Sequence, residues 1–252
     1  MHYVKRMTPP KLTLLQVAVF VLALVVAPSF AQTREPQPYI EKLIAGRPAK
    51  LPRLVEFSPA CEENSELAQR AVGLTPKTAI FLTCFVHAER WLEFQSGTTS
   101  HLYPYIALSV SVPHPSGDYT RVDFEKLKVA AREQLGELLA NVEGSRERLR
   151  EQDANLQARG EGIRRDEYQQ AFRGVFPSST DGLSFSYLVA RSAVMTERGQ
   201  TAPLREVNAV STLLFAGRLV LVNVVDHFIP SEQGTQAREL SKRWLQAFKE
   251  LN

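Results

Sequence analysis

Hydrophobic residues follow two different periods along the chain, and the first of these predicts β-strands. Residues 79–86 are almost continuously apolar, which is typical of a strand that is buried on both faces. Residues 105–112 and 183–190 alternate apolar with polar side chains, which is typical of strands with one buried face. Two further apolar runs, 206–215 and 218–228, are separated only by a short link, so they predict an antiparallel hairpin.

The second period, with apolar residues three and four positions apart, predicts helices. Asp123 is predicted to cap a helix whose apolar stripe contains Phe124, Leu127, Ala131, Leu135, Leu138 and Val142. A short helix is predicted over 64–72, and a last helix near 235–251 carries on one face Leu240, Trp244, Phe248 and Leu251. The predicted fold class is therefore α+β, with a mainly antiparallel sheet of about five strands flanked by amphipathic helices.

Two segments depart from these periods. Residues 32–60 contain five prolines, which block long helices and central strands, so they predict a Pro-rich N-terminal arm before a single domain at 61–252. Residues 144–173 carry dense charge of both signs, which favours a charged helical or loop insertion. A second interpretation stays open, because Leu149 and Leu156 lie seven residues apart and would form a thin seam for a protein partner.

The first 31 residues have the order of a secretory signal peptide. Basic residues precede an apolar run from 12 to 26, and the small residues Ser29 and Ala31 follow it. Cleavage is predicted between Ala31 and Gln32, which places the mature chain in a bacterial-type periplasm or outside the cell. The alternative is an uncleaved inner-membrane anchor formed by residues 12–27, but its apolar run falls short of the roughly 20 residues that span a bilayer.

Removal of the signal peptide changes the charge of the chain. The full sequence has 30 basic and 27 acidic residues, and three of the basic residues lie in the first 31, which contain no acid. The mature chain is therefore balanced at 27 of each sign and has no overall electrostatic attraction for nucleic acid or anionic membranes. We expect no nucleic-acid partner, and membrane attachment only through an uncleaved leader.

The two cysteines, Cys61 and Cys84, both lie in the mature chain. An oxidising envelope compartment favours a disulfide between them, which would stabilise the fold by about 3 kcal/mol by closing the intervening loop. Two buried free thiols are the alternative, because Cys84 lies in an apolar run where cysteine often serves as a small hydrophobe. A metal site needs more ligands than this spacing offers, so no metal is predicted.

The sequence contains no motif that is highly specific for catalysis or for a cofactor, and no cofactor is predicted. One alternative is a cluster of histidines and acids at strand ends, in a small periplasmic hydrolase or metal-dependent enzyme. His87 and Glu89 are expected on the same side of a strand near its end, and Asp226 and His227 on opposite sides at the end of another strand. The favoured interpretation is that each of these four faces water at a strand end.

Aromatic residues gather between the first two predicted strands, at Trp91, Phe94, Tyr103 and Tyr105. Packing between sheet and helix is the favoured role for them. An exposed aromatic rim that contacts a protein or a ligand is the alternative.

The hairpin from 207 to 222 and the amphipathic helix after it resemble the end of a PsbP-type α/β/α sandwich. The resemblance lies in the order of elements in the last part of the chain. It implies a small exported antiparallel sheet flanked by helices, in a family whose members tend to bind or assist assemblies rather than catalyse. The charged segment 144–173 departs from that pattern, and no functional residue is carried over. The functional hypothesis is an exported, non-catalytic binding or assembly factor whose partner is another envelope protein.

Overall fold

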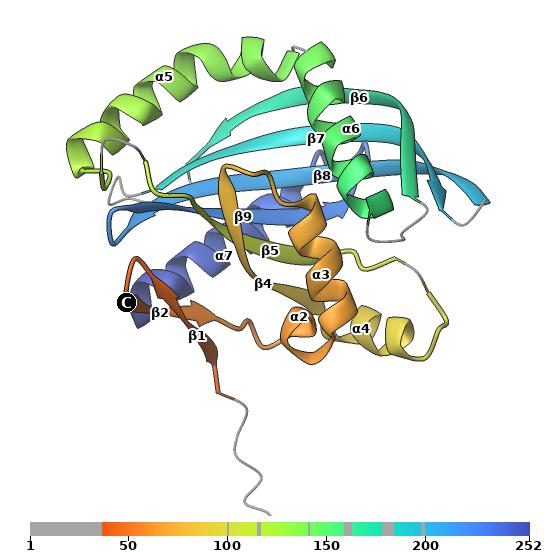
Figure 1. Cartoon of the computed structure of the whole chain (residues 1–252), viewed down its shortest axis with the longest axis horizontal. Helices are drawn as coiled ribbons and strands as arrows, with labels where there is room; N and C mark the ends of the chain where they lie inside the picture. The colour runs from red at the N-terminus through yellow and green to blue at the C-terminus, as the bar shows by residue number, and fades with distance from the viewer. Residues whose placement is uncertain are drawn as a thin grey trace, which may run out of the picture. The chain divides into compact units, whose positions relative to one another are not determined.

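The strands form one large sheet and one separate hairpin (Figure 1). The computed structural model describes residues 37–99, 101–114, 117–140, 142–158, 163–177, 184–197 and 200–252. The large sheet has seven antiparallel strands in the order β3-β4-β5-β9-β8-β7-β6, and β1 pairs with β2. The strands are β1 (Tyr39–Ile44), β2 (Arg47–Pro52), β3 (Phe57–Ser58), β4 (Ala79–His87), β5 (Tyr105–Ser111), β6 (Ile163–Phe176), β7 (Ser184–Glu197), β8 (Gln200–Phe215) and β9 (Arg218–His227). The helices are α2 (Ala60–Glu63), α3 (Ser65–Leu74), α4 (Ala88–Gln95), α5 (Arg121–Ala140), α6 (Val142–Ala158) and α7 (Thr235–Leu251).

The predicted α+β fold class is confirmed, but the sheet has seven strands rather than five. The two strands that were not predicted are β3 and β6, which lie at its two edges. β3 has only two residues, which is too short for a period to show. The predicted cleavage at Ala31 and Gln32 and the anchor at 12–27 lie outside the described residues. Within the part of the chain that the structure describes, no helix is long and apolar enough to span a membrane.

The charged segment 144–173 lies mostly in a helix and an edge strand, so the predicted insertion is wrong for its second half. That half forms most of β6, which pairs with β7. Several of its charged side chains, such as those of Arg164, Glu167 and Arg173, are exposed, and charge on an edge strand also discourages pairing with another chain. The guanidinium of Arg165 in β6 donates to Asp153 Oδ1 in α6 at 2.6 and 2.8 Å, and both side chains are largely buried. This ion pair joins the edge strand to the helix.

The Pro-rich segment is not an arm outside the domain, because residues 39–52 form the hairpin β1–β2. Its inward residues Ile44, Ala49 and Leu51 are almost fully buried in the main core. Each strand of a two-stranded hairpin has one free edge, so Pro48 and Pro52 can occupy strand positions without breaking a ladder on both sides. Proline density therefore excluded a central strand but not an edge hairpin.

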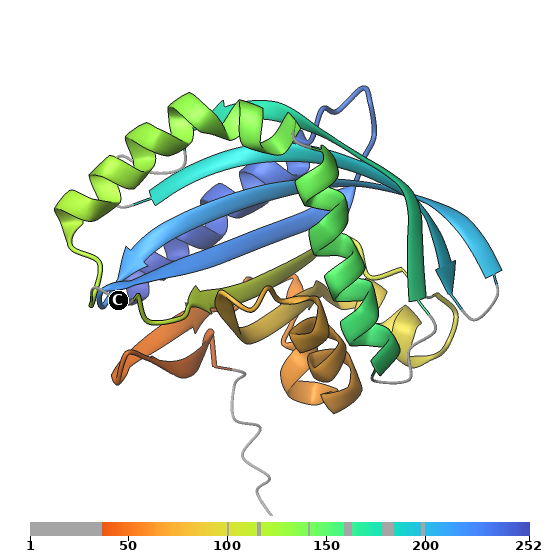
Figure 2. The ribbon, with the colours of Figure 1, turned by 45° about the horizontal axis from the view of Figure 1, so that its top comes forward.

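Helices cover the two faces of the sheet differently (Figures 1 and 2). α7 and the β1–β2 hairpin pack on one face, where the main core contains Ile106, Leu108, Val220, Val222, Val224, Leu240, Trp244, Leu245 and Phe248. α3, α5 and α6 contact the other face. The second core lies on that face, beneath α2, α3 and α4, and contains Ala60, Cys61, Cys84, Val86 and Trp91.

Local contacts fix the start of α5 and the turn between β8 and β9. Thr120, rather than Asp123, caps α5, because the Thr120 hydroxyl oxygen accepts the Asp123 N–H at 3.2 Å and the Asp123 carboxylate accepts the Thr120 N–H at 3.0 Å. The predicted hairpin between β8 and β9 is confirmed, with a turn at Ala216 and Gly217 in which both residues have positive φ. A Cβ at Gly217 would lie 2.5 Å from the Asp118 side chain, so the turn requires glycine.

Candidate binding site

The four residues of the predicted histidine and acid cluster lie at strand ends, but β5 separates them. Val86, Tyr105 and Val225 oppose one another across β4, β5 and β9. His87 and Asp226 each follow this row by one residue, so two strand spacings, about 10 Å, lie between them. No three histidine, cysteine or acidic side chains of the described residues are grouped so that they could hold a metal ion.

Glu89 and His227 point away from the other two. The strand ends at His87, and Glu89 is exposed on the first turn of α4, so the prediction that these two share one side of a strand is wrong. The ring of His87 packs edge-on against Phe57 at 5.7 Å. His227 lies on the opposite face, with its ring centroid 6.4 Å from that of Tyr103. The arrangement therefore brings no acid and base together with a nucleophile.

The Asp226 carboxyl is partly buried at the end of β9. Burial raises the pKa of its carboxyl, and the negative charge of Glu232 raises it further. The hydrogen bond that the carboxyl accepts from the backbone N–H of His227, at 2.7 Å, acts in the opposite direction. The folded state therefore binds this proton more tightly than the unfolded chain, so the ionised form lowers the free energy of unfolding at neutral pH. We expect Asp226→Asn to raise the denaturant midpoint at pH 7, because the amide oxygen keeps the hydrogen bond without the charge.

The advantage of Asp226→Asn is expected to shrink as the pH falls through the raised pKa, where the wild-type carboxyl becomes neutral. Denaturant titrations at pH 7 and near pH 4 measure this. Glu133→Gln, at an exposed position of α5, is the control for the removal of one negative charge. An unchanged or lowered midpoint of Asp226→Asn at pH 7 would contradict the expectation.

The structure contains the predicted disulfide, which joins α2 to β4 through Cys61 and Cys84 with a Cα–Cα distance of 5.1 Å. Both cysteines lie in the second core beside Trp91, which is 3% exposed and stacks on Phe94. The Trp91 indole N–H donates to a carboxylate oxygen of Glu63 at 2.6 Å. The favoured packing role is therefore confirmed for Trp91, and this region is a structural cluster rather than a binding rim.

The other two predicted aromatics belong to a polar cluster on the same face of the sheet. The Tyr103 hydroxyl donates to Glu206 at 3.1 Å, and Glu206 also pairs with Arg191 at 3.5 Å. Burial, followed by the negative charge of Glu206, raises the pKa of both Tyr103 and Tyr105 far above the usual range of tyrosine. Both hydroxyls therefore stay protonated at physiological pH, which suits a structural hydrogen-bonding role.

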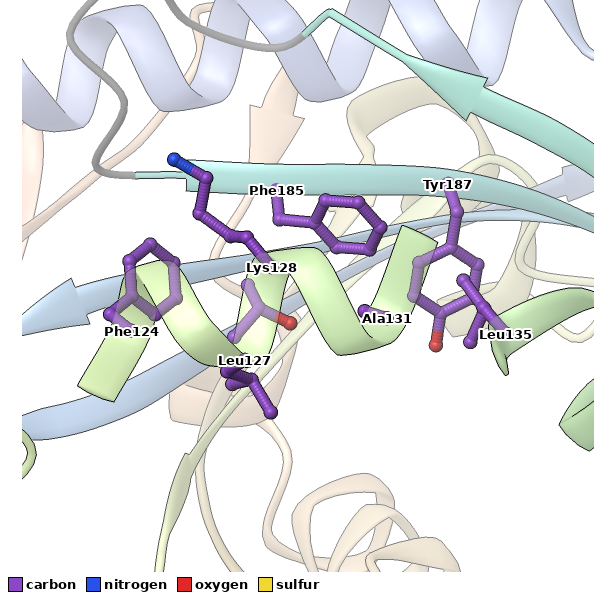
Figure 3. Close-up of a pocket in the computed structure, with 8 residues that line it drawn as sticks. Phe124, Leu127, Lys128, Ala131, Leu135, Phe185 and Tyr187 are labelled. Atoms are coloured by element: carbon purple, nitrogen blue, oxygen red, sulfur yellow. The ribbon is translucent and has the colours of Figure 1, made fainter. Parts of the chain in front are cut away.

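A small apolar cavity lies between α5 and the sheet, with a volume of about 120 Å³ (Figure 3). Its walls come from one face of α5 and from β7 and β8, and the lining residues are Phe124, Leu127, Lys128, Ala131, Leu135, Phe185, Tyr187 and Thr212. Phe185 opposes Thr212 across the two strands. An apolar cavity of about 150 Å³ is known to hold benzene, so this space suits one aromatic or branched aliphatic group.

One lining residue is charged. Lys128 occupies the apolar face of α5 and is only 7% exposed. Its ammonium lies 2.9 and 3.0 Å from the two carboxylate oxygens of Glu125, and 5.8 Å from the ring centroid of Phe124. Figure 3 shows the Lys128 stem among the lining residues and its nitrogen at one end of the group. The Lys128 stem therefore contributes to the apolar lining, while its ammonium lies beside Glu125.

Three apolar side chains of α5 are exposed, and one of them borders the cavity. Leu127 lines the cavity and is 38% exposed, while Val122 and Val129 are 63% and 52% exposed. Val122 and Val129 lie seven residues apart and share the side of the helix that is turned away from the cavity. Leu127 alone of these three carries the apolar lining to the surface, and an apolar cavity that opens beside an exposed apolar side chain is a common feature of binding surfaces.

The sequence predicted the inward stripe of α5 but assigned it entirely to core packing. Lys128 lies four residues after Phe124, inside that stripe, and a lysine at such a position is the one signal that the face does more than fill a core. The cavity itself has no sequence signal, because it depends on how closely α5 approaches Phe185 and Tyr187 of β7.

Comparison with known proteins finds similarity of structure only. No protein-family model matches the chain, and no curated protein matches it. The Ran-binding protein Mog1p of Saccharomyces cerevisiae is 14% identical over 84% of this chain and 94% of its own, with a TM-score of 0.34. The cyanobacterial PsbP (CyanoP) of Synechocystis is 9% identical over 69% of this chain and 82% of its own, with a TM-score of 0.31. Identities and scores at this level carry no inference about function.

Proposed function

We propose that this protein is an exported, non-catalytic binding factor that engages a protein of the cell envelope through α5 and the cavity beneath it. The observation that carries the proposal is the cavity of about 120 Å³, whose apolar lining continues into exposed Leu127 on the same helix. A site of this kind gains affinity by removing an apolar group of the partner from water. Its size suits a single anchoring side chain of the partner, as in many hot spots.

Export is the second part of the proposal. It is supported by the basic, apolar and small-residue order of the first 31 residues. The buried disulfide between Cys61 and Cys84 also supports it, because structural disulfides persist in oxidising compartments. The mature chain is expected to begin at Gln32, and the mass of the protein purified from the envelope fraction measures this.

Site-specific photo-crosslinking in intact cells tests the binding surface. A photoreactive phenylalanine analogue at Leu127, which lines the cavity and is 38% exposed, is expected to form an adduct with an envelope protein. The same analogue at Gln236, an exposed position of α7 on the other face of the sheet, is the matched control and should give no such adduct. Equal adducts at both positions would contradict the proposal.

Filling the cavity completes the test. Ala131 is half-buried and lines the cavity, so Ala131→Phe places a ring in the space that the partner's side chain would occupy. We expect the Leu127 adduct to fall at least tenfold in this variant, with the denaturant midpoint used to verify folding, and with Ala131→Leu as the smaller substitution. An adduct that survives both substitutions would show that binding does not use the cavity.

A further inference from the structure

The sheet face that carries the α5 cavity is incompletely covered at its centre. Thr212 of β8 lines the cavity and opposes Leu221 of β9, while Asn223, two residues further along β9, opposes Ala107 of β5. Cross-strand partners and residues two positions apart share one face, so these four side chains continue the cavity wall across three strands. All four are half-buried, and we call them the central strip. β9 and β5 run between α5 and α3 in both views (Figures 1 and 2).

The opposite face of β9 is covered completely. Val220, Val222 and Val224 are each 0% exposed, and α7 packs on that face. An antiparallel sheet whose second face is left to water normally carries polar and charged side chains there. The central strip instead combines leucine, alanine, threonine and asparagine and contains no charge. An open face of this composition, continuous with an apolar cavity, is suited to contact with a partner.

One amide group indicates the chemistry of what lies on the strip. Asn208 of β8 is 3% exposed, its Nδ2 lies 3.5 Å from Asn223 Oδ1, and its own Oδ1 is buried without a hydrogen-bond partner. The Asn223 amide is therefore engaged through its oxygen, and among the residues that the structure describes none accepts from its two N–H donors. A leucine at this position would leave no polar group unpaired, so the amide suits recognition of an acceptor supplied by a partner.

We propose that the central strip binds the main chain of an extended, uncharged segment of the partner, and that one side chain of this segment fills the α5 cavity. Asn223 Nδ2 donates to a main-chain carbonyl of the segment, with Asn208 as a positioning residue that holds the Asn223 oxygen. This inference rests on the proposed function and names the part of the partner that is bound. The strip reaches from β8 to β5, two strand spacings or about 10 Å, which an extended chain covers in about three residues.

Other occupants fit these residues less well. A hydrocarbon chain offers no acceptor for the Asn223 amide. A charged segment would lose its hydration over a strip that has no charge to pair with it. The main chain of an uncharged peptide supplies a carbonyl at every residue and demands no counter-ion.

Two crosslinking positions test whether one segment lies over both the cavity and the strip. The photoreactive phenylalanine analogue at Leu127 and at Leu221 is expected to trap the same envelope protein in intact cells. Mass spectrometry of the digested adducts should place the two crosslinks within about five residues of each other, in a stretch without charged side chains. Val129, which is exposed on the side of α5 turned away from the cavity, is the control position and should not trap this segment.

Asn223→Leu separates a binding role from a structural one. We expect the Leu127 adduct to fall about tenfold, while the denaturant midpoint stays equal or rises because an incompletely paired amide is replaced by an apolar side chain. Gln169→Leu, at an exposed amide of β6 on the opposite face of the sheet, is the matched control and should leave the adduct unchanged. A lowered midpoint with an unchanged adduct would assign Asn223 to the structure alone and overturn its role in binding.

The crosslinks also distinguish this inference from the proposed function. An adduct at Leu127 without one at Leu221 would overturn binding at the strip and leave the cavity as the site. Adducts at both positions that map to distant or charged stretches of the partner would overturn the single extended segment. Absence of both adducts would overturn the proposed function as well.

Discussion

Replacement of Trp244 by alanine is expected to lower the free energy of unfolding by about 4 kcal/mol, the usual cost of removing a fully buried large aromatic side chain. Trp244 of α7 is 0% exposed and stacks on Phe248 with ring centroids 5.4 Å apart. Its indole N–H donates to the carbonyl of Pro52 at 3.1 Å, so the residue holds both the sheet and the β1–β2 hairpin against α7. The substitution leaves a cavity and an unpaired carbonyl at one place.

Equilibrium denaturation measures this effect, and two further variants divide it. Trp244→Phe keeps most of the ring contact but loses the hydrogen bond to Pro52, so it is expected to cost about 1 to 2 kcal/mol. Gln246→Ala, at an exposed position of the same helix, should change stability by less than about 0.5 kcal/mol. A cost below about 1 kcal/mol for Trp244→Ala would mean that α7 does not close the main core.

Loss of the disulfide is expected to cost about 3 kcal/mol, because the bond closes a loop between residues 23 positions apart and removes that freedom from the unfolded chain. The double variant Cys61→Ala with Cys84→Ala tests this without leaving a lone thiol. Denaturant midpoints of the variant, of the oxidised protein and of the reduced protein give the comparison. Reduction and substitution should have similar effects, since both remove the same cross-link.

The region that loses protection when the disulfide is removed is as informative as the loss of stability. The disulfide lies in the second core with Trp91, whereas α7 and the hairpin belong to the main core. Hydrogen exchange in the double variant is therefore expected to accelerate first in α2, α3 and α4, with the amides of β8 and β9 still protected. Identical midpoints for oxidised and reduced protein would contradict a stabilising role for the bond.

Local pattern was enough for those elements whose period is strong. The apolar run at 79–86 and the alternation at 105–112 predicted β4 and β5 to within one residue. Burial of one strand face requires an apolar residue at every second position, and burial of both faces requires a continuous apolar run. The β8–β9 hairpin was predicted from the two-residue link Ala216-Gly217, because two strands joined by so short a link can pair only in the antiparallel direction. The last helix followed from the stripe that includes Trp244.

The pattern failed where a neighbour in space, rather than a neighbour in sequence, decides the structure. β6 carries mixed charge and still forms a 14-residue strand, because β7 supplies its ladder and α6 supplies the Asp153 partner for Arg165. The hairpin β1–β2 contains two prolines and still packs, because α7 offers an apolar surface for Leu51 and its neighbours. α4 was not predicted because its start at Ala88 directly follows a strand.

The candidate site divides in the same way. The sequence by itself determined the inward stripe of α5 and the two cysteines that the disulfide joins, because composition and period are local properties. Only the tertiary structure decided that β5 separates His87 from Asp226 and that a cavity lies beneath α5. It alone placed Phe185 and Tyr187, which are about 60 residues from Phe124 in the chain, opposite that stripe. Cavities and convergent groups depend on the distance between packed elements, and that distance is set by the whole core rather than by any one segment.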